Sequence, residues 1–362
     1  MANIISIATA VPEWKHSQED ILSFMQASYQ LNDIEKRKLK FLYHQSGIHY
    51  RHSVIKDYGQ QIRDENSFIP LNNTDTYPTI DKRMQLYNQH ALPLSMDAAA
   101  QCFTEQIKPT DITHLITVSC TGMSAPGLDL SLVNALALPP TINRTSINFM
   151  GCYAAIHALK QADYICKAAA EANVLIVCTE LCTLHFQKES TPDNITSSLL
   201  FADGAAAVIV SNQKSTKYIL LNDFYSKLVF RGNDSMAWHI SKDGFLMTLS
   251  SYVPQVIEED IDELLSEALS KKDLTKNAIQ HWCIHPGGKK ILEAFSKSTG
   301  IDNEALKHAY HILSNYGNMS SPTVLFVLKE IWQVTGNDKK IFGCAFGPGL
   351  TIETFIATAY TS

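Results

Sequence analysis

The order of motifs in the first half of the chain recurs in the second half, and this repetition constrains the fold more than any single segment does. In the first half an apolar run ends at residues 119–122, a helical pattern starts near 148–152, and residues 201–204 lead into another apolar run. The second half has corresponding motifs in the same order, at 284–288, 317–320 and 346–349. Corresponding motifs lie 165, 169 and 145 residues apart, which indicates an old duplication with loops of different length.

Short runs rich in β-branched residues alternate with helical patterns along the chain, which is typical of α/β proteins. The sequence predicts helices at 153–170, 257–269 and 322–332, a loop over 60–88, and buried strands at 114–119, 174–179, 205–210, 282–285 and 341–346. Together with the duplication, this pattern predicts a layered α/β fold of two related halves, 1–220 and 221–362. The strand ends and helix starts of both halves would then meet at one site.

Composition excludes several classes of protein. With 30 Lys+Arg against 36 Asp+Glu, the net charge of −6 gives no general reason to bind nucleic acid. Charged residues make up only 18%, which suggests additional buried surface and a homodimer. No apolar run approaches the ~20 residues needed to span a bilayer, and the N-terminus lacks a signal-peptide pattern. We therefore expect a cytoplasmic protein whose eight cysteines stay reduced, most of them as core residues.

Three residues at strand ends and helix starts could carry out chemistry. Cys152 follows a glycine at a predicted helix start, where unpaired backbone N–H groups and the helix dipole favour a nucleophilic thiolate. His285 ends a predicted strand and is followed by Pro-Gly-Gly, which lets a ligand approach closely. Asn318 precedes a predicted helix, where an N-cap is the simpler interpretation. Because the three occupy corresponding places in the duplication, we expect them to share a site.

Other motifs are weaker. His281, Cys283 and His285 alternate along a strand, and Cys178 and Cys182 are four residues apart, but neither pattern has four zinc ligands. No metal and no cofactor is therefore expected. Residues 347–349, Gly-Pro-Gly, lack the Lys-Ser/Thr of a phosphate loop and precede a strand, so we interpret them as a rigid turn that lines a pocket.

Six segments together resemble the type III polyketide synthases, the chalcone synthase-like enzymes of the thiolase fold: 120–127, 150–153, 200–206, 285–288, 316–321 and 345–351. The resemblance implies that Cys152 carries an acyl group delivered by an acyl-CoA starter, and that malonyl-CoA extends it. His285 would hold the Cys152 thiolate in an ion pair. With Asn318, it would also stabilise the thioester oxygen and the enolate formed by decarboxylation.

The resemblance also implies the residues around the nucleophile. Phe201 and Trp238 fall at the positions of two aromatic gatekeepers between the CoA tunnel and the cavity, where Trp238 is similar to bacterial members. Core packing is the alternative for both. Further pocket positions are Cys120, Cys182, His185, Ser320, Gly347, Pro348 and Gly349. For CoA, the matching positions are Arg51 and Gly287.

The bacterial-like pattern favours an alkylpyrone, an alkylresorcinol or a small phenol as the product, made from a fatty acyl starter. Two alternatives remain open. One is a cysteine hydrolase, since Cys, His and Asn occur in the same chain order as in papain-like proteases. The other is a non-catalytic acyl-CoA-binding protein, although the presence of all three candidate residues argues against it.

Overall fold

A nine-stranded mixed sheet forms the centre of the protein, seen in a computed structural model that describes residues 1–29, 31–59, 68–69, 77–250 and 252–361. Its strand order is β11-β12-β13-β8-β1-β7-β6-β4-β5. In chain order these strands are β1 (Asn3–Ala10), β4 (His114–Ser119), β5 (Asn143–Asn148), β6 (Asn173–Leu181), β7 (Asp203–Ser211), β8 (Lys217–Leu228), β11 (His281–Ile284), β12 (Lys339–Gly347) and β13 (Thr351–Thr361). Two hairpins lie outside the sheet: β2 (Trp14–Ser17) with β3 (Tyr50–Ser53), and β9 (Met236–Ser241) with β10 (Gly244–Leu249).

The two halves of this sheet repeat one topology. In the first half β4 pairs with β6 in parallel, and β6-β7-β1 continue antiparallel. In the second half β11 pairs with β12 in parallel, and β12-β13-β8 continue antiparallel. The halves join through an antiparallel pairing of β1 with β8. The boundary expected between residues 220 and 221 falls inside β8, so the halves share one sheet rather than separating at a linker.

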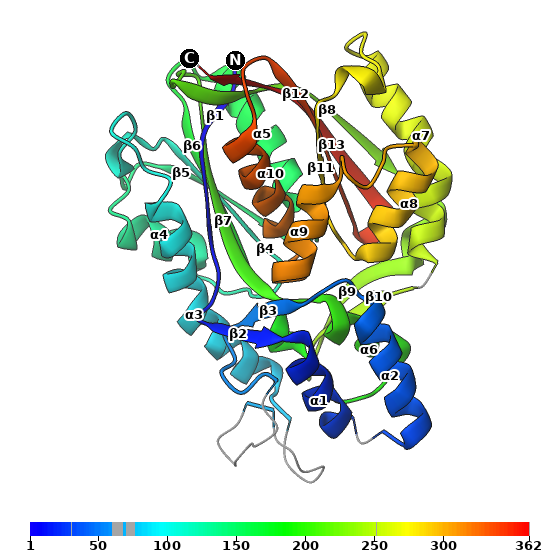
Figure 1. The fold of residues 1–362 in the computed structure, drawn as a ribbon. Coiled ribbons are helices and arrows are strands. Elements are labelled where there is room, and N and C mark those ends of the chain that lie inside the picture. Colours follow the sequence, from blue (N-terminus) through cyan, green and yellow to red (C-terminus); the bar gives the residue numbers. More distant parts are fainter. Residues whose placement is uncertain (30, 60–67, 70–76, 251, 362) are drawn as a thin grey trace.

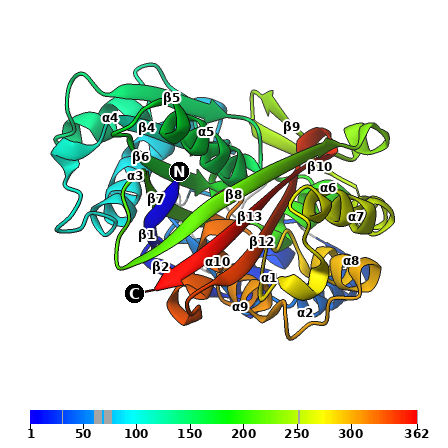
Figure 2. The same ribbon diagram turned by 90° about the horizontal axis from the view of Figure 1, so that it is seen from above.

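Helices cover the sheet in layers (Figures 1 and 2). The central helices α5 and α10 each contact strands of both halves, whereas α3 and α4 cover the outer face of the first half and α7 and α8 that of the second. The helices are α1 (Gln18–Ser28), α2 (Asp33–Gln45), α3 (Ile80–Ala100), α4 (Leu128–Ala135), α5 (Ala154–Ala168), α6 (Pro192–Leu200), α7 (Val253–Ser270), α8 (Lys289–Thr299), α9 (Lys307–Tyr316) and α10 (Pro322–Val334).

The sequences of the central helices explain their position. Every residue of α10 from 322 to 328 is buried, so the helix has no polar face in this stretch and must be covered on all sides. The buried face of α5 consists largely of alanines, including Ala155, Ala158 and Ala162, which allow close packing against both halves of the sheet. The α5 and α10 starts are therefore fixed at the centre of the molecule.

Most elements expected from the sequence are confirmed, since the five predicted strands match β4, β6, β7, β11 and β12, and the three helices match α5, α7 and α10. The loop expected over 60–88 is wrong at its end, because α3 begins at Ile80. Charged residues such as Arg83 weaken the apolar periodicity here, yet Arg83 is buried and donates to the carbonyls of Pro78 and Phe186. Residues 60–67 and 70–76 lie outside the described part.

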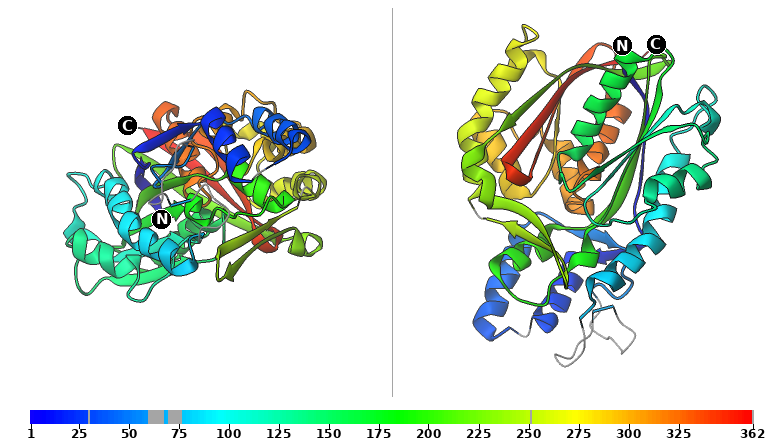
Figure 3. Two further views of the ribbon diagram at one scale, coloured as in Figure 1. Left: turned by 90° about the horizontal axis from the view of Figure 1, so that it is seen from below. Right: turned by 180° about the vertical axis from the view of Figure 1, so that it is seen from behind.

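Smaller elements gather at the end of the molecule opposite the two termini (Figure 3). They are α1, α2, α6 and the two hairpins (Figures 1 and 3), and residues of α2, α6, β9 and β10 line the cavity described below. In the part of the chain that the structure describes, no helix is both long enough and apolar enough to cross a bilayer.

Candidate active site

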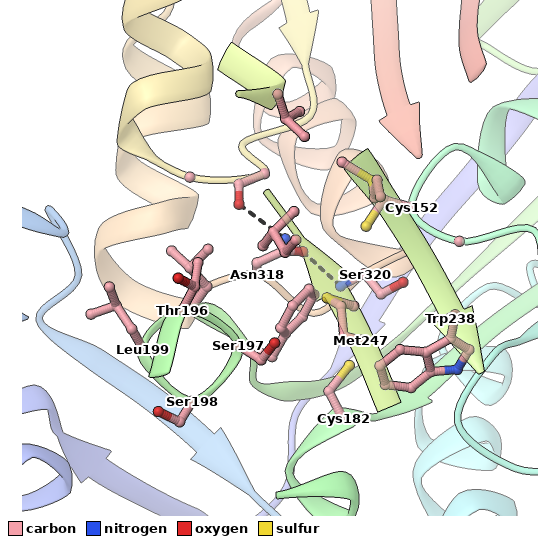
Figure 4. A pocket seen from close by; sticks show the side chains of 18 of the residues that line it. Cys152, Cys182, Thr196, Ser197, Ser198, Leu199, Trp238, Met247, Asn318 and Ser320 are labelled. Carbon is pink, nitrogen blue, oxygen red and sulfur yellow. Dashed lines mark hydrogen bonds between the residues drawn. The ribbon is translucent and has the colours of Figure 1, made fainter. Parts of the chain in front are cut away.

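A cavity of 270 Å³ lies where the two halves meet, and its lining includes Cys152, His285 and Asn318. Cys152 comes from the start of α5 in the first half. His285 follows β11, and Asn318 lies between α9 and α10, both in the second half. The structure therefore brings the three candidate residues together as the duplication requires. Figure 4 shows Cys152, Asn318 and Ser320 on one side of this cavity and Cys182 and Trp238 on the other.

Cys152 lies just before the first turn of α5, whose N-cap is Tyr153. The preceding Gly151 has φ +82°, and a side chain there would collide with Pro348, so glycine is required at this position. Burial raises the pKa of the Cys152 thiol to about 12, although hydrogen bonding from Ser320 and Asn318 partly opposes this shift. Desolvation thus opposes the thiolate that the helix start is expected to favour.

His285 is almost completely enclosed, with 1% of its surface exposed. Its backbone N–H donates to the carbonyl of Cys344, which continues the β11-β12 pairing by one residue. Neither ring nitrogen has a hydrogen-bond partner among the described residues, and burial lowers the pKa of the imidazole to about 3. Burial therefore favours the neutral imidazole and opposes the ion pair with Cys152 that the resemblance implies. Leaving such a group unpaired costs about 1–3 kcal/mol, which is reasonable where a ligand supplies the partner.

Asn318 has a fixed side chain. Its Nδ2 donates to the carbonyl of Gly287 at 3.1 Å, and its Oδ1 accepts the backbone N–H of Ser320 at 2.8 Å. Asn318 therefore does not cap α10, whose N-cap is Ser321, and the simpler interpretation offered above is wrong. Because one amide hydrogen is held by Gly287, the other remains for a group bound beside Cys152.

Glu180, which the sequence analysis missed, is a buried residue behind the lining of the cavity. It accepts hydrogen bonds from the backbone N–H of Cys120 at 2.9 Å, from Thr121 Oγ1 at 2.8 Å and from Ser321 Oγ at 3.0 Å. Burial raises its pKa to about 7. The carboxyl group thus joins the end of β4 to the start of α10. A single acidic residue near the end of the apolar strand β6 is the signal that could have revealed it.

Aromatic rings form the wall on the side of the β9-β10 hairpin. His185 Nε2–H donates to the carbonyl of Thr121 at 2.7 Å, and its Nδ1 accepts the backbone N–H of Phe245 at 3.1 Å. Its ring stacks on that of Phe245 with centroids 4.2 Å apart, and Trp238 Nε1–H donates to the carbonyl of Cys120 at 2.7 Å. His185 therefore fastens the hairpin to the end of β4. Burial lowers its pKa to about 3, so this arrangement does not titrate at neutral pH.

Phe201, Cys182 and Met247 form the neighbouring wall. Arg51, expected at the CoA site, instead supports this wall from behind: it is fully buried, and its guanidinium donates to the carbonyls of Phe201 and Ser198, each at 2.7 Å. The expectation of CoA contact at Arg51 is wrong, because the side chain reaches neither solvent nor the cavity.

The remaining predicted pocket residues differ in position. Cys120, Ser320, Pro348 and Gly287 line the cavity, whereas Gly347 and Gly349 do not. Gly347 instead lies against the ring of Tyr153, and a side chain there would overlap it. The Gly-Pro-Gly segment is a short turn before β13, as expected, but only its proline faces the pocket. Among the described residues, no group of three or more His, Cys, Asp or Glu side chains could hold a metal ion.

The mouth of the cavity lies between α2 and the start of α8. Leu42 and Gln45 of α2 line one side of the mouth, and Lys289 and Lys290 line the other. The stem of Lys289 is 3.4 Å from the position that a Cβ on Gly47 would occupy, so the loop after α2 and the start of α8 are close neighbours. Lys289 and Lys290 therefore place positive charge at the mouth of the cavity, whereas the predicted basic residue, Arg51, is buried.

Comparisons with known proteins agree with this geometry. The family model of the N-terminal domain of chalcone and stilbene synthases matches residues 1–214, and that of the C-terminal domain matches 223–361. A putative chalcone synthase of Bacillus subtilis is 31% identical, over 98% of both chains. The alpha-pyrone synthesis polyketide synthase-like Pks18 of Mycobacterium tuberculosis is 32% identical, over 76% of this chain and 72% of that protein. The crystal structure of PKS-I from the brown alga Ectocarpus siliculosus superimposes with a TM-score of 0.90 at 27% identity, covering 99% of this chain and 98% of that one.

Proposed function

Because this chain belongs to the chalcone and stilbene synthase family, the type III polyketide synthases, we propose that it loads an acyl-CoA starter onto Cys152, extends it with malonyl-CoA and cyclises the product. The observation that carries this proposal is the enclosed imidazole of His285, which has two unpaired ring nitrogens and shares a cavity with a thiol and an amide. A thioester oxygen bound beside Cys152 would provide the missing partner.

Loading of the starter begins from a neutral pair, since burial raises the pKa of Cys152 and lowers that of His285. As the thioester binds, His285 takes the proton of the Cys152 thiol, and the sulfur attacks the acyl carbon. The C–S bond to CoA breaks, and His285 returns the proton to the departing CoA thiolate. The free amide hydrogen of Asn318 donates to the acyl oxygen while it carries negative charge.

Extension uses the same donors on malonyl-CoA. Loss of CO2 leaves an enolate whose oxygen is stabilised by Asn318 and by an N–H of His285. The enolate carbon then attacks the acyl carbon on Cys152, and the bond from that carbon to the Cys152 sulfur breaks. The extended chain is left on CoA, and the Cys152 thiolate takes up a proton from solvent. One well-placed donor at such an oxygen contributes about 3 kcal/mol to the transition state. The walls formed by Phe201 and Trp238 limit the access of water to the enolate during this step.

Lys289 and Lys290 are the residues best placed to bind the CoA phosphates. They lie at the mouth of the cavity directly after Gly287 and Gly288, where α8 also presents its first backbone N–H groups. Gly287, predicted as a CoA contact, lines the same wall. Unlike the buried Arg51, both lysines are accessible to the phosphates of CoA in solution.

For the substrate we propose an alkyl starter and an alkylpyrone, alkylresorcinol or small phenol as the product. The lining of the cavity includes the apolar side chains of Met247, Leu249 and Val253, and apart from two histidines its only ionisable nitrogen groups are Lys289 and Lys290 at the mouth. Such a lining suits a hydrocarbon chain and, apart from the two lysines, offers no charged group to bind a polar starter.

The test is incubation of the purified protein with malonyl-CoA and a panel of short, long and aromatic acyl-CoAs, followed by mass spectrometry of the products. We expect lactones or phenols heavier than the starter by whole acetate units, formed from alkyl starters and lost in His285→Ala. Activity confined to aromatic starters would contradict the proposed substrate, and release of free acid without extension would favour a thioester hydrolase.

We also propose that the protein is a homodimer. Strand β5 is the outer strand of the sheet beside β4, and all of its residues except Ile147 are exposed. An open strand edge of this kind is normally covered by another chain or by a blocking element. Light scattering at micromolar concentration should give about twice the mass of one chain, and the mass of a single chain would contradict the proposal.

A further inference from the structure

We propose that the outward face of α2 is a docking surface for an acidic carrier protein, which presents an acyl group on its phosphopantetheine arm to the cavity. This inference rests on the proposed function and names a second source of the starter. It concerns one surface, the outward face of α2, defined by Ile34, Arg37, Lys38 and Phe41.

The outward face of α2 is open to solvent. Of the thirteen residues of α2, only Leu39 and Tyr43 are buried. Ile34 and Phe41, two helical turns apart, are 59% and 64% exposed, and Leu42 is 39% exposed. Exposed side chains of this size on one helix form an apolar ridge, which is a common mark of a protein interface.

Positive charge flanks this ridge. Arg37 and Lys38 lie between Ile34 and Phe41 in the helix, and the same segment also contains Lys36 and Lys40. None of these four side chains has an ion pair with an acidic side chain within the described residues. The nearby carboxylate of Glu35 is used at the helix start, where it accepts the N–H of Asn32. In a chain of net charge −6, this unpaired basic helix marks a surface for an acidic partner.

The outward face of α2 continues into the mouth of the cavity. Leu42 and Gln45, one turn further along the helix, line the cavity itself, opposite Lys289. A partner bound to α2 would therefore hold a flexible arm next to the opening that leads to Cys152. Helix α2 lies at the end of the molecule away from the termini (Figure 1).

An acidic protein fits these features better than two other ligands. Free CoA would use the lysines at the mouth, but it has no need of Ile34 and Phe41, which do not line the cavity. A membrane surface requires a larger apolar face than these two side chains provide. A carrier protein needs both an apolar contact and opposite charge, and both are present.

The transfer moves the acyl group from one sulfur atom to another. The Cys152 sulfur, after losing its proton to His285, attacks the acyl carbon of the thioester on the phosphopantetheine arm. The bond from that carbon to the pantetheine sulfur breaks, and the pantetheine thiolate takes up the proton. The products are acyl-Cys152 and the free thiol of the carrier protein.

The experiment compares two donors of one acyl group: octanoyl-CoA and a purified bacterial fatty-acid carrier protein charged with octanoate. Acylation of Cys152 is followed by intact-protein mass spectrometry in the wild type, in Arg37→Glu and in Phe41→Ser. Lys272→Glu and Val334→Ser are matched controls, because both residues are exposed and neither lines the cavity. We expect the two α2 variants to lose at least about ten-fold in the rate from the carrier protein. Their rate from octanoyl-CoA should stay within about two-fold, and both controls should match the wild type.

Four results would overturn the inference. If the wild type is acylated by octanoyl-CoA but not by the carrier protein, docking is wrong and the proposed function stands. Equal losses with both donors would assign the helix to folding or to CoA binding. Binding to vesicles of phosphatidylglycerol that is lost in Phe41→Ser, without any change in transfer from the carrier, would identify a membrane surface. Failure of both donors in the wild type would contradict the proposed function itself.

Discussion

The two halves of the sheet have the same topology, but they supply different groups to the cavity. The first half provides the thiol of Cys152, and its buried carboxyl groups Glu180 and Asp203 hold Thr121 and Thr183, which line the cavity. The second half provides the imidazole of His285 and the amide of Asn318. The duplication thus accounts for where a functional group is presented, at strand ends and helix starts. The residue type at each place determines its chemistry.

The halves also differ in what holds their groups. In the first half, Glu180 and Asp203 accept hydrogen bonds that fix loops around the cavity, and Asp203 binds Thr183 and the N–H of Val54. Burial raises the pKa of Asp203 to about 6. In the second half Asn318 is held by backbone groups, and the ring of His285 by packing alone. The first half should therefore be the more sensitive of the two to pH.

The largest effect is expected from the nucleophile of the first half. Cys152→Ala removes the atom that carries the acyl chain, so product formation should fall at least about 1,000-fold. Cys182→Ala is a matched control, since both cysteines are 9% exposed and line the same cavity, and it should lose at most about ten-fold. Steady-state product formation with a common starter measures both, and similar losses would show that Cys152 has no special role.

Asn318→Ala tests the contribution of the second half separately. Loading of Cys152 should fall by at most about ten-fold, because His285, protonated by the thiol, can still donate to the acyl oxygen. Extension should fall about 100-fold, because the enolate oxygen keeps only the N–H of a neutral His285. Intact-protein mass spectrometry reports loading, and decarboxylation of malonyl-CoA reports the second step. Equal losses in both steps would contradict the division of roles.

Arg51→Met tests whether Arg51 supports the wall at Phe201 rather than binding CoA. Removal of the guanidinium leaves the carbonyls of Ser198 and Phe201 without their donor, so the free energy of unfolding should fall by about 2–4 kcal/mol. Urea denaturation measures the loss. An unchanged stability combined with a raised KM for malonyl-CoA would restore Arg51 to the CoA site.

Glu180→Gln tests the buried carboxyl group that joins the end of β4 in the first half to the start of α10 in the second. Because burial raises the pKa of Glu180 to about 7, the folded protein holds this proton more tightly than the unfolded chain. Protonated Glu180 makes its full contribution to the free energy of unfolding below pH 4.5, the pKa of this group in the unfolded chain. This contribution, about 3 kcal/mol, is lost as the pH rises through 7. The variant should lack this component, so the wild type should lose more stability than Glu180→Gln between pH 5 and pH 8. Parallel pH profiles would contradict the raised pKa.

The smallest effect is expected at the β9-β10 hairpin. His185→Phe keeps a ring against Phe245 but removes the hydrogen bonds to Thr121 and to the Phe245 backbone, which should cost about 1–2 kcal/mol. A looser hairpin should broaden the range of product chain lengths. The product distribution measures this, with Trp238→Phe as a second variant that loses only the bond to Cys120. An unchanged distribution in both would show that the hairpin does not set the size of the cavity.

Much of the fold could be predicted, because the apolar runs of β4, β6 and β12 and the helical patterns of α5 and α10 are strong local signals. The start of α3 could not, since Arg83 is buried by pairing with backbone carbonyls of a distant segment. The meeting of Cys152, His285 and Asn318 followed from the duplication.

Their protonation states could not be predicted in the same way. The helix start suggested a thiolate at Cys152, but desolvation depends on how completely the surrounding elements enclose it. Arg51 and Glu180 were misjudged or missed for the same reason, since the sequence does not show which charged groups have partners inside the fold. The basic residues at the cavity mouth could not be identified from sequence, because only the fold brings the start of α8 next to the loop that follows α2.

The most direct test of the central claim is a pulse-chase of the covalent intermediate. The protein is first acylated with labelled octanoyl-CoA alone, digested and mapped by mass spectrometry, and in a parallel sample malonyl-CoA is then added. The account predicts label on the peptide that contains Cys152 and its transfer into an extended product after malonyl-CoA is added. Label on Cys120 or Cys182 instead, or extended product without any acyl-Cys152, would contradict it.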